Sequence, residues 1–500
     1  MARILASFLF SLILPVSLFA QSGNPFLSMD YWEGNPSIAE IDTEIIKGHS
    51  VTESSNSGFD ATSYAILGRA PFETVTYLLG KGIDVNTIAH GASYVYWAGY
   101  RGNLPLVKHL IENGASIEGD ESDNYTMLLF SALGGELTPE MADYLISQGS
   151  DLKNEVTPKG ANALHLTSYK FTDVAQIEYF TDRGIDLHAT DNEGNGIFYY
   201  ASRSGNIELL DNLIEMGVEY QGNNSKGGNA FLSAVRNREN PVSFFEYLEG
   251  LGLEPNVKTD AGYTPLHRLA FVADNTEAIE WFVAKGVDPN KVDTSSGNTP
   301  LINAVFYNDS TSVIEYFAER TDNVNHQNNN GYSALTRAVR SASVESTNYL
   351  LELGADALVL DKNGSNLYSF LLSNFDADAE EEFIAKFELL RENGLDEAAL
   401  QGNGKTLYHL AADNGDIALF KLIAELTSID INAKDHEGYT ALHHMAMKAK
   451  DDSALKYLLS IGANKHTTTD FEESPFDLAS ENELLLDNGT NLDFLSSNEE

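Results

Sequence analysis

A short glycine-centred element recurs along this 500-residue chain at steps that cluster near 34 residues. In each copy the glycine is followed by an apolar or small residue and then usually by an acidic or polar one. The copies are Gly82-Ile83-Asp84, Gly114-Ala115-Ser116, Gly149-Ser150-Asp151, Gly184-Ile185-Asp186, Gly217-Val218-Glu219, Gly252-Leu253-Glu254, Gly286-Val287-Asp288, Gly354-Ala355-Asp356, Gly394-Leu395-Asp396 and Gly462-Ala463-Asn464. A single hydrophobic core stops growing at roughly 250–300 residues, so a longer chain with a fixed period is predicted to stack its repeats into a solenoid.

Each glycine closes an apolar stretch with helical spacing. In residues 207–214, for example, Leu210, Leu213 and Ile214 fall on one helix face. Gly217 then serves as a left-handed helix stop. A polar stretch with a second turn signal follows, and then another short helix, so one repeat is predicted to be a turn and two helices. Two wider gaps are filled by copies that lack the glycine, at Arg320-Thr321-Asp322 and Thr427-Ser428-Ile429-Asp430.

The start of the first helix carries a specific motif. Thr264-Pro265-Leu266-His267 resembles the opening of the first helix of an ankyrin repeat, and partial copies in register contain His165, His409 and His443. Thr264 can cap the helix, Pro265 suits its first turn because its missing N–H costs nothing there, and Leu266 is expected to pack inward. The resemblance implies that each histidine bonds to neighbouring backbone and ties one repeat to the next.

The resemblance extends over nearly the whole chain and implies an all-α ankyrin-repeat solenoid. It predicts about twelve helix-turn-helix repeats with short finger turns, between capping segments. The expected domains are a signal peptide at 1–20, an N-terminal capping unit at 21–58, the solenoid at 59–495 and a frayed tail at 496–500.

The N-terminus has the pattern of a secretory signal peptide. Met1-Ala2-Arg3 gives a positive start, residues 4–19 form an apolar run, and Ala20 is a small residue, so cleavage is expected before Gln21. No later stretch is apolar enough to span a membrane, and the chain has no cysteine, which excludes disulfides and thiolate metal sites. We expect an exported protein, periplasmic or secreted, of bacterial origin, without membrane insertion after signal removal.

The chain is strongly acidic. Its 74 acidic and 31 basic residues give a formal charge of −43, which repels nucleic acid and anionic membranes. The acidic faces attract cationic partners or simply keep the protein soluble, and composition does not separate these interpretations. We expect a monomer that binds one or more proteins and no nucleic acid.

Candidates for chemistry are few. His165, His267, His409 and His443 occupy equivalent places in repeats about 10 Å apart, too far for one zinc ion, and the adjacent His443 and His444 point in different directions on a helix. The acidic run at 376–382 could hold a cation such as calcium, or it could be a solvated loop whose carboxylates favour the following helix. The sequence therefore predicts no catalytic residue, no metal site, no cofactor and no enzyme.

A partner is expected on the concave face, which ankyrin repeats build from finger turns and the ends of first helices. Tyrosines follow the turn at Tyr263, Tyr332 and Tyr439. The slots at the helix ends hold Tyr100, Arg101, Tyr169, Lys170, Arg203, Arg236, Phe271, Phe306, Tyr307, Arg340, Met447 and Lys448. Aromatic residues and arginines are typical of binding hot spots.

The same slots hold six basic residues and one acid, Asp413, in a chain with twice as many acids as bases. One interpretation is a groove less negative than the opposite face, which would receive a neutral or partly anionic protein surface. The other is that the helix dipole favours basic residues at this end in any protein.

The predicted function is that of a non-catalytic protein-binding scaffold outside the cytoplasm. Two alternatives stay open: a structural or accessory protein that stabilises an envelope enzyme or assembly, and an exported effector that binds host proteins. The repeats differ from one another, which favours one particular partner over a generic surface.

Overall fold

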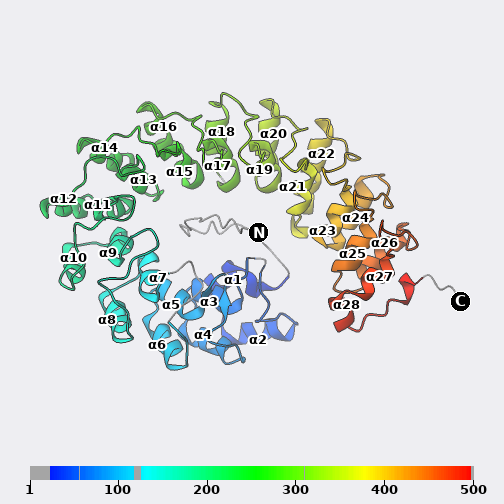
Figure 1. Cartoon of the computed structure of the whole chain (residues 1–500), viewed down its shortest axis with the longest axis horizontal. Coiled ribbons are helices and arrows are strands. Elements are labelled where there is room, and N and C mark those ends of the chain that lie inside the picture. The colour runs from blue at the N-terminus through cyan, green and yellow to red at the C-terminus, as the bar shows by residue number, and fades with distance from the viewer. Residues whose placement is uncertain (1–22, 56, 118–124, 309, 497–500) are drawn as a thin grey trace. The chain divides into compact units, whose positions relative to one another are not determined.

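The computed structural model describes residues 23–55, 57–117, 125–308 and 310–496 (Figure 1). The expected signal peptide and most of the expected tail lie outside the described residues. The chain divides into two compact units, and the boundary along the sequence falls between Glu254 and Pro255. We call them unit 1 and unit 2 and describe each by itself.

Unit 1 begins with the short elements η1 (Pro25–Leu27), α1 (Met29–Glu33) and α2 (Ile38–Ile46). Pairs of helices then follow one another along the chain. The first helices of these pairs are α3 (Ala61–Leu67), α5 (Tyr94–Tyr100), α7 (Met127–Leu133), α9 (Ala163–Thr167), α11 (Ile197–Ala201) and α13 (Ala230–Ala234). The second helices are α4 (Phe72–Leu79), α6 (Leu104–Glu112), α8 (Pro139–Ser147), α10 (Val174–Thr181), α12 (Ile207–Glu215) and α14 (Val242–Gly250). The 3₁₀ turns η2 (Ser168–Lys170) and η3 (Ser202–Ser204) continue α9 and α11, and β1 (Ile88–Ala89) pairs with β2 (Ala92–Ser93) in an antiparallel turn.

Unit 2 repeats the same arrangement. Its first helices are α15 (Pro265–Val272), α17 (Pro300–Tyr307), α19 (Ala334–Ser341), α21 (Leu367–Ser373), α23 (Leu407–Asn414), α25 (Ala441–Lys448) and α27 (Pro475–Ser480). Its second helices are α16 (Glu277–Ala284), α18 (Thr311–Ala318), α20 (Val344–Glu352), α22 (Glu380–Glu392), α24 (Ile417–Leu426), α26 (Ser453–Ser460) and α28 (Glu483–Asp487). The 3₁₀ turns are η4 (Ala377–Ala379) and η5 (Asp493–Leu495).

The first helices start at polar caps. The Thr299 hydroxyl accepts a hydrogen bond from the Ile302 N–H, and the Asn162 side chain accepts one from the His165 N–H. These bonds satisfy backbone donors that have no partner within the helix. Pro300 follows its cap directly, at the one turn where proline fits a helix. The motif therefore specifies where each first helix begins.

The second helices are amphipathic and end at glycine. In α12, Leu209, Leu210 and Leu213 are buried against the first helices, while the acidic side chains between them face solvent. Gly217 follows with a φ of +79°, a conformation that costs a side chain but not glycine. The N–H of Val218 then donates to the Leu213 carbonyl and closes the helix end.

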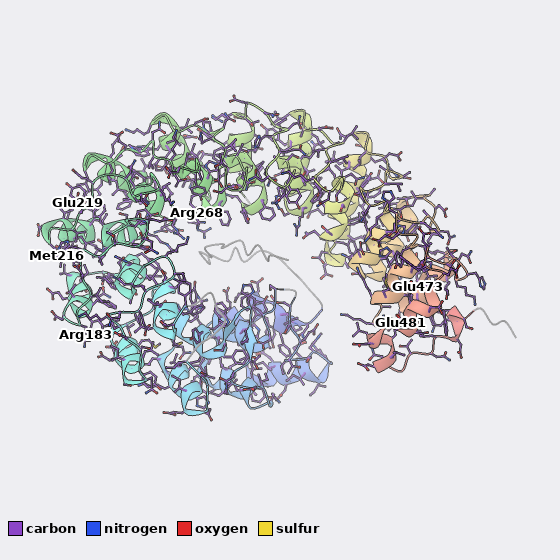
Figure 2. All side chains as sticks on the ribbon, in the orientation of Figure 1. Arg183, Met216, Glu219, Arg268, Glu473 and Glu481 are labelled. Atoms are coloured by element: carbon purple, nitrogen blue, oxygen red, sulfur yellow. The ribbon has the colours of Figure 1, made fainter. Side chains whose placement is uncertain are left out.

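Within each unit the helices form two layers. Each first helix packs on the first helix of the next repeat, and the second helices cover one side of this stack. Figure 1 shows the first helices on the inner side of the bend of each unit. Figure 2 places Arg268 on this inner side, whereas Arg183 and Met216 lie on the outer side. We call the two sides the inner face and the outer face.

The predicted all-α repeat fold is confirmed. The described residues contain twelve helix pairs from α3 to α26, and α27 with α28 forms a shorter thirteenth. The domain boundaries at 21, 59 and 496 stay predictions. Among the residues that the structure describes, no helix is both long and apolar enough to cross a membrane.

Candidate partner-binding surface

The predicted binding residues occupy equivalent places on the inner face. Most of them lie at or just after the C-terminal end of a first helix, or in the 3₁₀ turn that continues it. The other three, Tyr263, Tyr332 and Tyr439, directly precede the N-caps of α15, α19 and α25. The register read from the sequence is thus the register of the structure. Their role in binding stays a prediction.

In unit 1, two tyrosines, a lysine and an arginine follow one another along this face. The guanidinium of Arg203 stacks over the ring of Tyr169 at 4.2 Å, and Lys170 lies 5.7 Å from the same ring. Tyr100 packs its ring 5.7 Å from that of Phe130. Burial raises the pKa of both Tyr100 and Tyr169, so their hydroxyls stay protonated at neutral pH.

Arg203 has no counter-ion within the described residues. It is half-buried, and its guanidinium makes neither an ion pair nor a hydrogen bond there. Burial, together with repulsion from Arg236, lowers the pKa of Arg203, which means that the folded protein holds this charge at a cost.

Arg101 behaves differently from the other predicted contact residues. Its Nε donates to the Leu67 carbonyl at 2.7 Å, and a second guanidinium nitrogen donates to the same oxygen. The guanidinium therefore ties two neighbouring repeats together, and less of it is available to a partner. Nearby, Arg69 pairs with Glu136 at 2.9 Å, and the sequence analysis singled out neither residue.

In unit 2 the inner face carries a cluster of aromatic rings. Phe271 lies 4.0 Å from Tyr307, and Phe306 lies 4.1 Å from the same ring. Arg337 stacks over Phe306 at 3.8 Å and over Tyr332 at 4.6 Å. Its Nε is buried without a hydrogen-bond partner in the described part of the chain, and burial lowers its pKa.

Arg337 was not predicted. It is the fourth residue of α19, and Arg268 has the same place in α15, where it lies 4.9 Å from the ring of Phe271. Aligning the fourth residue of every first helix would have found both arginines. The predicted candidates came from the helix ends, which do not include this position.

Two predicted tyrosines pack within their own repeat. Tyr263 stacks on His267 with ring centroids 5.2 Å apart, and Tyr439 lies 6.2 Å from His443. Both side chains are in contact with the motif histidine. This packing agrees with a structural role for the tyrosine after the turn glycine.

At the far end of unit 2 the inner-face charges compensate one another. Lys448 pairs with Asp413 at 2.9 Å, and Lys405 binds the same carboxylate at 2.5 Å. The side chain of Met447 beside them is 39% exposed. The predicted cation at Lys448 is thus already paired within the protein, with a carboxylate that it shares with Lys405.

The motif histidines fasten the stack and are buried. The Nδ1 atom of His409 accepts from the N–H and the hydroxyl of Thr406, and its Nε2 donates to the carbonyl of Tyr439 in the next repeat at 2.9 Å. His165 likewise donates to Ala189 at 2.9 Å. The Nε2 atoms of His267 and His443 make no hydrogen bond of this geometry within the described residues, although the backbone near Asn298 and near Thr467 in the following repeat interacts with these rings. Burial lowers the pKa of His267 and of His443 to about 4.

One group of side chains meets the spacing of a metal site. Ligand atoms of His409, Asp435 and His444 lie within 4.8 Å of one another. The sequence shows only that His443 and His444 are adjacent on one helix, and this contact of His444 with another repeat does not follow from that adjacency. However, both ring nitrogens of His409 are already hydrogen-bonded, and His444 Nε2 donates to Asp435 at 2.8 Å. The group is therefore a hydrogen-bond network with no free nitrogen lone pair on His409 for a metal.

The charge of Asp435 fits this network. Burial pushes the pKa of its carboxyl up, but hydrogen bonds from His444 and from the backbone N–H groups of Glu437 and Tyr439 outweigh burial and lower the pKa. Asp435 thus stays ionised and orients the turn before α25.

The acidic run at 376–382 covers the 3₁₀ turn η4 and the first turn of α22. The Asp376 carboxylate accepts from the Asp378 N–H at 3.0 Å, and Glu380 begins α22. Carboxylates at this place stabilise the start of the helix.

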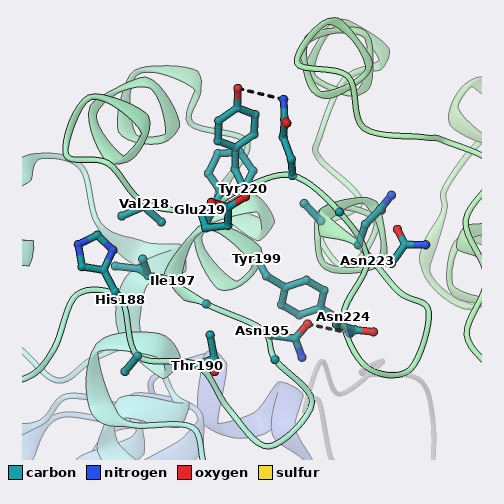
Figure 3. A pocket seen from close by; sticks show the side chains of 18 of the residues that line it. His188, Thr190, Asn195, Ile197, Tyr199, Val218, Glu219, Tyr220, Asn223 and Asn224 are labelled. Atoms are coloured by element: carbon teal, nitrogen blue, oxygen red, sulfur yellow. Dashed lines mark hydrogen bonds between the residues drawn. The ribbon is translucent and has the colours of Figure 1, made fainter.

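A small pocket opens between two finger turns of unit 1, near His188, Tyr199 and Glu219 (Figure 3). Its volume is about 140 Å³. The side chains of Asn195 and Asn224 bridge its base with a hydrogen bond of 2.8 Å. The spacing of motifs along the sequence does not reveal this pocket, because its lining comes from two successive repeats.

Comparison with protein families gives a direct match. The family described as "Ankyrin repeats (3 copies)" matches residues 231–327, 266–361 and 369–469. The matched segments lie between α13 and the turn before α27.

Individual relatives match shorter segments. Neurogenic locus notch homolog protein 1 of Homo sapiens is 33% identical over 157 residues, which is 31% of this chain and 6% of that protein. Palmitoyltransferase AKR1 of Lachancea kluyveri is 26% identical over 164 residues, 32% of this chain and 22% of that protein. Ankyrin repeat protein OPG189 of Variola virus is 29% identical over 119 residues, 23% of this chain and 21% of that protein. The chain thus spans less than a quarter of the length of each of these relatives.

Proposed function

Because this chain belongs to the ankyrin-repeat proteins, we propose that it is a non-catalytic scaffold that binds another protein through the inner face of its first helices. Ankyrin repeats indicate a protein-interaction scaffold. The relative named as a palmitoyltransferase matches a third of this chain at 26% identity, which transfers no activity.

One observation supports the choice of face. The inner-face arginines Arg203 and Arg337 stack on aromatic rings, and within the described residues no carboxylate pairs with either. Aromatic rings and arginines dominate binding energy at protein interfaces when a partner covers them. A surface that already contains both, half-buried and held in place, loses little side-chain entropy on binding.

We further propose that the protein acts outside the cytoplasm. The support is the positive start, the apolar run and the small residue at the N-terminus. The test is the N-terminal sequence of the protein recovered from the source cells or their medium. A start at Gln21 in the periplasm or medium supports export, whereas an intact Met1 in the cytoplasm contradicts it.

The alternatives differ in what they bind. An accessory protein would copurify with one envelope enzyme or assembly at constant stoichiometry. An exported effector would capture proteins from a host lysate and none from the source organism. The scaffold role on the inner face is common to all three.

The experiment is affinity capture with the chain from Gln21 onward and with paired substitutions. Replacing Phe306 and Tyr307 by alanine removes two inner-face rings. The matched control replaces Tyr179 and Arg183, an outer-face pair, by alanine. We expect capture to fail with the inner-face pair and to persist with the outer-face pair, and melting curves confirm that both variants fold. Unchanged capture by the inner-face variant would refute the assignment of the face.

A further inference from the structure

We propose that Arg203 and Arg236, with Tyr169 beside them, form a receptor for carboxylate side chains of an acidic segment in the partner protein. The proposal rests on the scaffold function and specifies the chemistry of the partner. It concerns unit 1 alone.

The geometry presents Arg203 as a fixed cation. Its guanidinium stacks over the ring of Tyr169 at 4.2 Å, and the two residues come from successive repeats through the packed turns η2 and η3. The backbone of Arg203 is also held, since the Asn240 amide donates to its carbonyl at 3.3 Å. Stacking fixes the plane of the guanidinium and leaves its edge for other acceptors, and a carboxylate can bind that edge with two hydrogen bonds.

A second cation reinforces the first. Arg236 directly follows the C-cap of α13, which packs on η3, so the two arginines stand one repeat apart on the same face. Like Arg203, Arg236 makes no ion pair or side-chain hydrogen bond within the described ranges. Two like charges held near each other without a counter-ion favour an anionic ligand that neutralises both.

The carboxylates near this pair are already bound; on the side of Arg236, Asp191 accepts a hydrogen bond from the Tyr200 hydroxyl at 2.6 Å. Tyr100, Tyr169, Lys170 and Arg236 surround Arg203. Glu136 acts on Tyr169 from a distance, but its carboxylate pairs with Arg69 at 2.9 Å. No carboxylate of the described chain is thus left to satisfy Arg203.

The outer face of the same unit shows what a satisfied arginine looks like. Arg183 stacks over Tyr179 at 3.7 Å, as Arg203 stacks over Tyr169. In contrast, Arg183 also pairs with Asp143 at 3.2 Å and bonds to the Tyr179 carbonyl at 3.1 Å. The difference between the two stacks is the carboxylate, and this identifies the ligand that Arg203 lacks.

Charge complementarity selects a short acidic protein segment over a polyanion. The chain carries a formal charge of −43, which repels nucleic acid over the whole surface. A segment with a few glutamates or aspartates carries less charge than a polyanion, so the acidic chain repels it less. It also gains two charge-assisted contacts at the arginines. The tyrosine rings beside them provide apolar area for the residues that flank the carboxylates.

The test uses two pools of synthetic nonapeptides with random flanks. One pool carries glutamate at two central positions, and the other carries glutamine there. We expect the chain from Gln21 onward to retain the glutamate pool about tenfold better than the glutamine pool, and Arg203→Gln/Arg236→Gln to abolish that preference. Arg183→Gln is the matched control and should keep it.

Each outcome decides the proposal. Arg203→Lys/Arg236→Lys keeps the charge without the planar fork and should retain part of the preference, which separates recognition from misfolding. Equal retention of both pools by the unaltered chain, or a preference that survives the double glutamine substitution, would overturn the carboxylate receptor. The scaffold function would then stand or fall separately, by protein capture with the Phe306 and Tyr307 variant.

Discussion

The two faces of the molecule use the same pair of residue types in opposite ways. On the outer face of unit 1, Arg183 stacks on Tyr179 and pairs with Asp143 at 3.2 Å. On the inner face, Arg203 stacks on Tyr169 with no carboxylate partner in the described residues. The outer arginine is thus paired within the fold, whereas the inner one has no carboxylate partner among the described residues.

Unit 2 repeats the contrast independently. The outer-face Arg320 lies 3.7 Å from the ring of Tyr316 and 3.2 Å from the carboxylate of Glu319. The inner-face Arg337 stacks on two rings and has no ion pair among the residues described. Arg203 and Arg337 thus lack a carboxylate partner within the described residues although acids outnumber bases in this chain, and this contrast supports the binding role proposed for the inner face.

The largest predicted effect is the pH dependence of stability that comes from the buried histidines beneath the inner face. His267 and His443 are buried and neutral, with a pKa of about 4 against about 6.5 in an unfolded chain. Between these values the unfolded chain takes up protons that the folded protein refuses. Stability is therefore full above pH 6.5 and falls by about 1.4 kcal/mol per pH unit for each histidine as the pH drops toward 4.

Urea unfolding at several pH values measures this loss. His267→Gln should flatten the slope between pH 6.5 and 4. The exposed His188 gives the control, since His188→Gln should leave the slope unchanged. An unaltered slope in His267→Gln would contradict the role of burial.

The aromatic cluster of unit 2 gives the next largest effect. Phe306→Ala with Tyr307→Ala removes rings that lie 4.1 Å apart on the inner face. Hot-spot rings cost about 2 kcal/mol or more each when truncated, so we expect partner affinity to fall at least thirtyfold. Titration calorimetry with the captured partner measures it, and a loss below about threefold would break the contrast between faces.

A smaller effect is expected from salt. The inner-face arginines attract a partner in part through charge, which screens with a Debye length of about 10 Å at 0.1 M and 3 Å at 1 M salt. Partner association should slow as salt rises, and the dependence should weaken in Arg203→Gln. Stopped-flow association rates at several salt concentrations check this. A salt dependence that is equal in the two proteins would show that Arg203 takes no part.

The smallest effect concerns stability without a partner. Arg203→Gln removes a stacked but unpaired charge, so we expect the free energy of unfolding to change by less than about 0.5 kcal/mol. Arg183→Gln removes an exposed ion pair, which contributes about 0–1 kcal/mol. Thermal melting of both variants makes the comparison. A large loss in Arg203→Gln would assign that arginine to the fold and not to binding.

The sequence predicted the repeat, its caps and the places of the helix-end residues, because these follow from local spacing. Thr264 and Pro265 define where a helix starts whatever surrounds them. In contrast, the inward turn of Arg101 toward Leu67 and the stacking of Arg337 on Phe306 depend on the offset between repeats. The spacing of residues within one repeat does not predict the offset between neighbouring repeats.

The sequence also did not predict which charged side chains form ion pairs. Arg183 and Asp143 lie forty residues apart, as do many residues that never meet. The sequence pattern placed Lys448 on the inner face, but it did not predict that Asp413 pairs with this lysine. The contrast between faces therefore appears only when each side chain is followed to its neighbours.

One measurement tests the central claim most directly. The affinity of the captured partner is compared for the unaltered chain, for Arg203→Gln/Arg236→Gln on the inner face and for Arg183→Gln/Arg320→Gln on the outer face. We predict a loss of about tenfold or more for the inner pair and a change within about twofold for the outer pair. Equal losses for the two pairs, or a larger loss for the outer pair, would contradict the account.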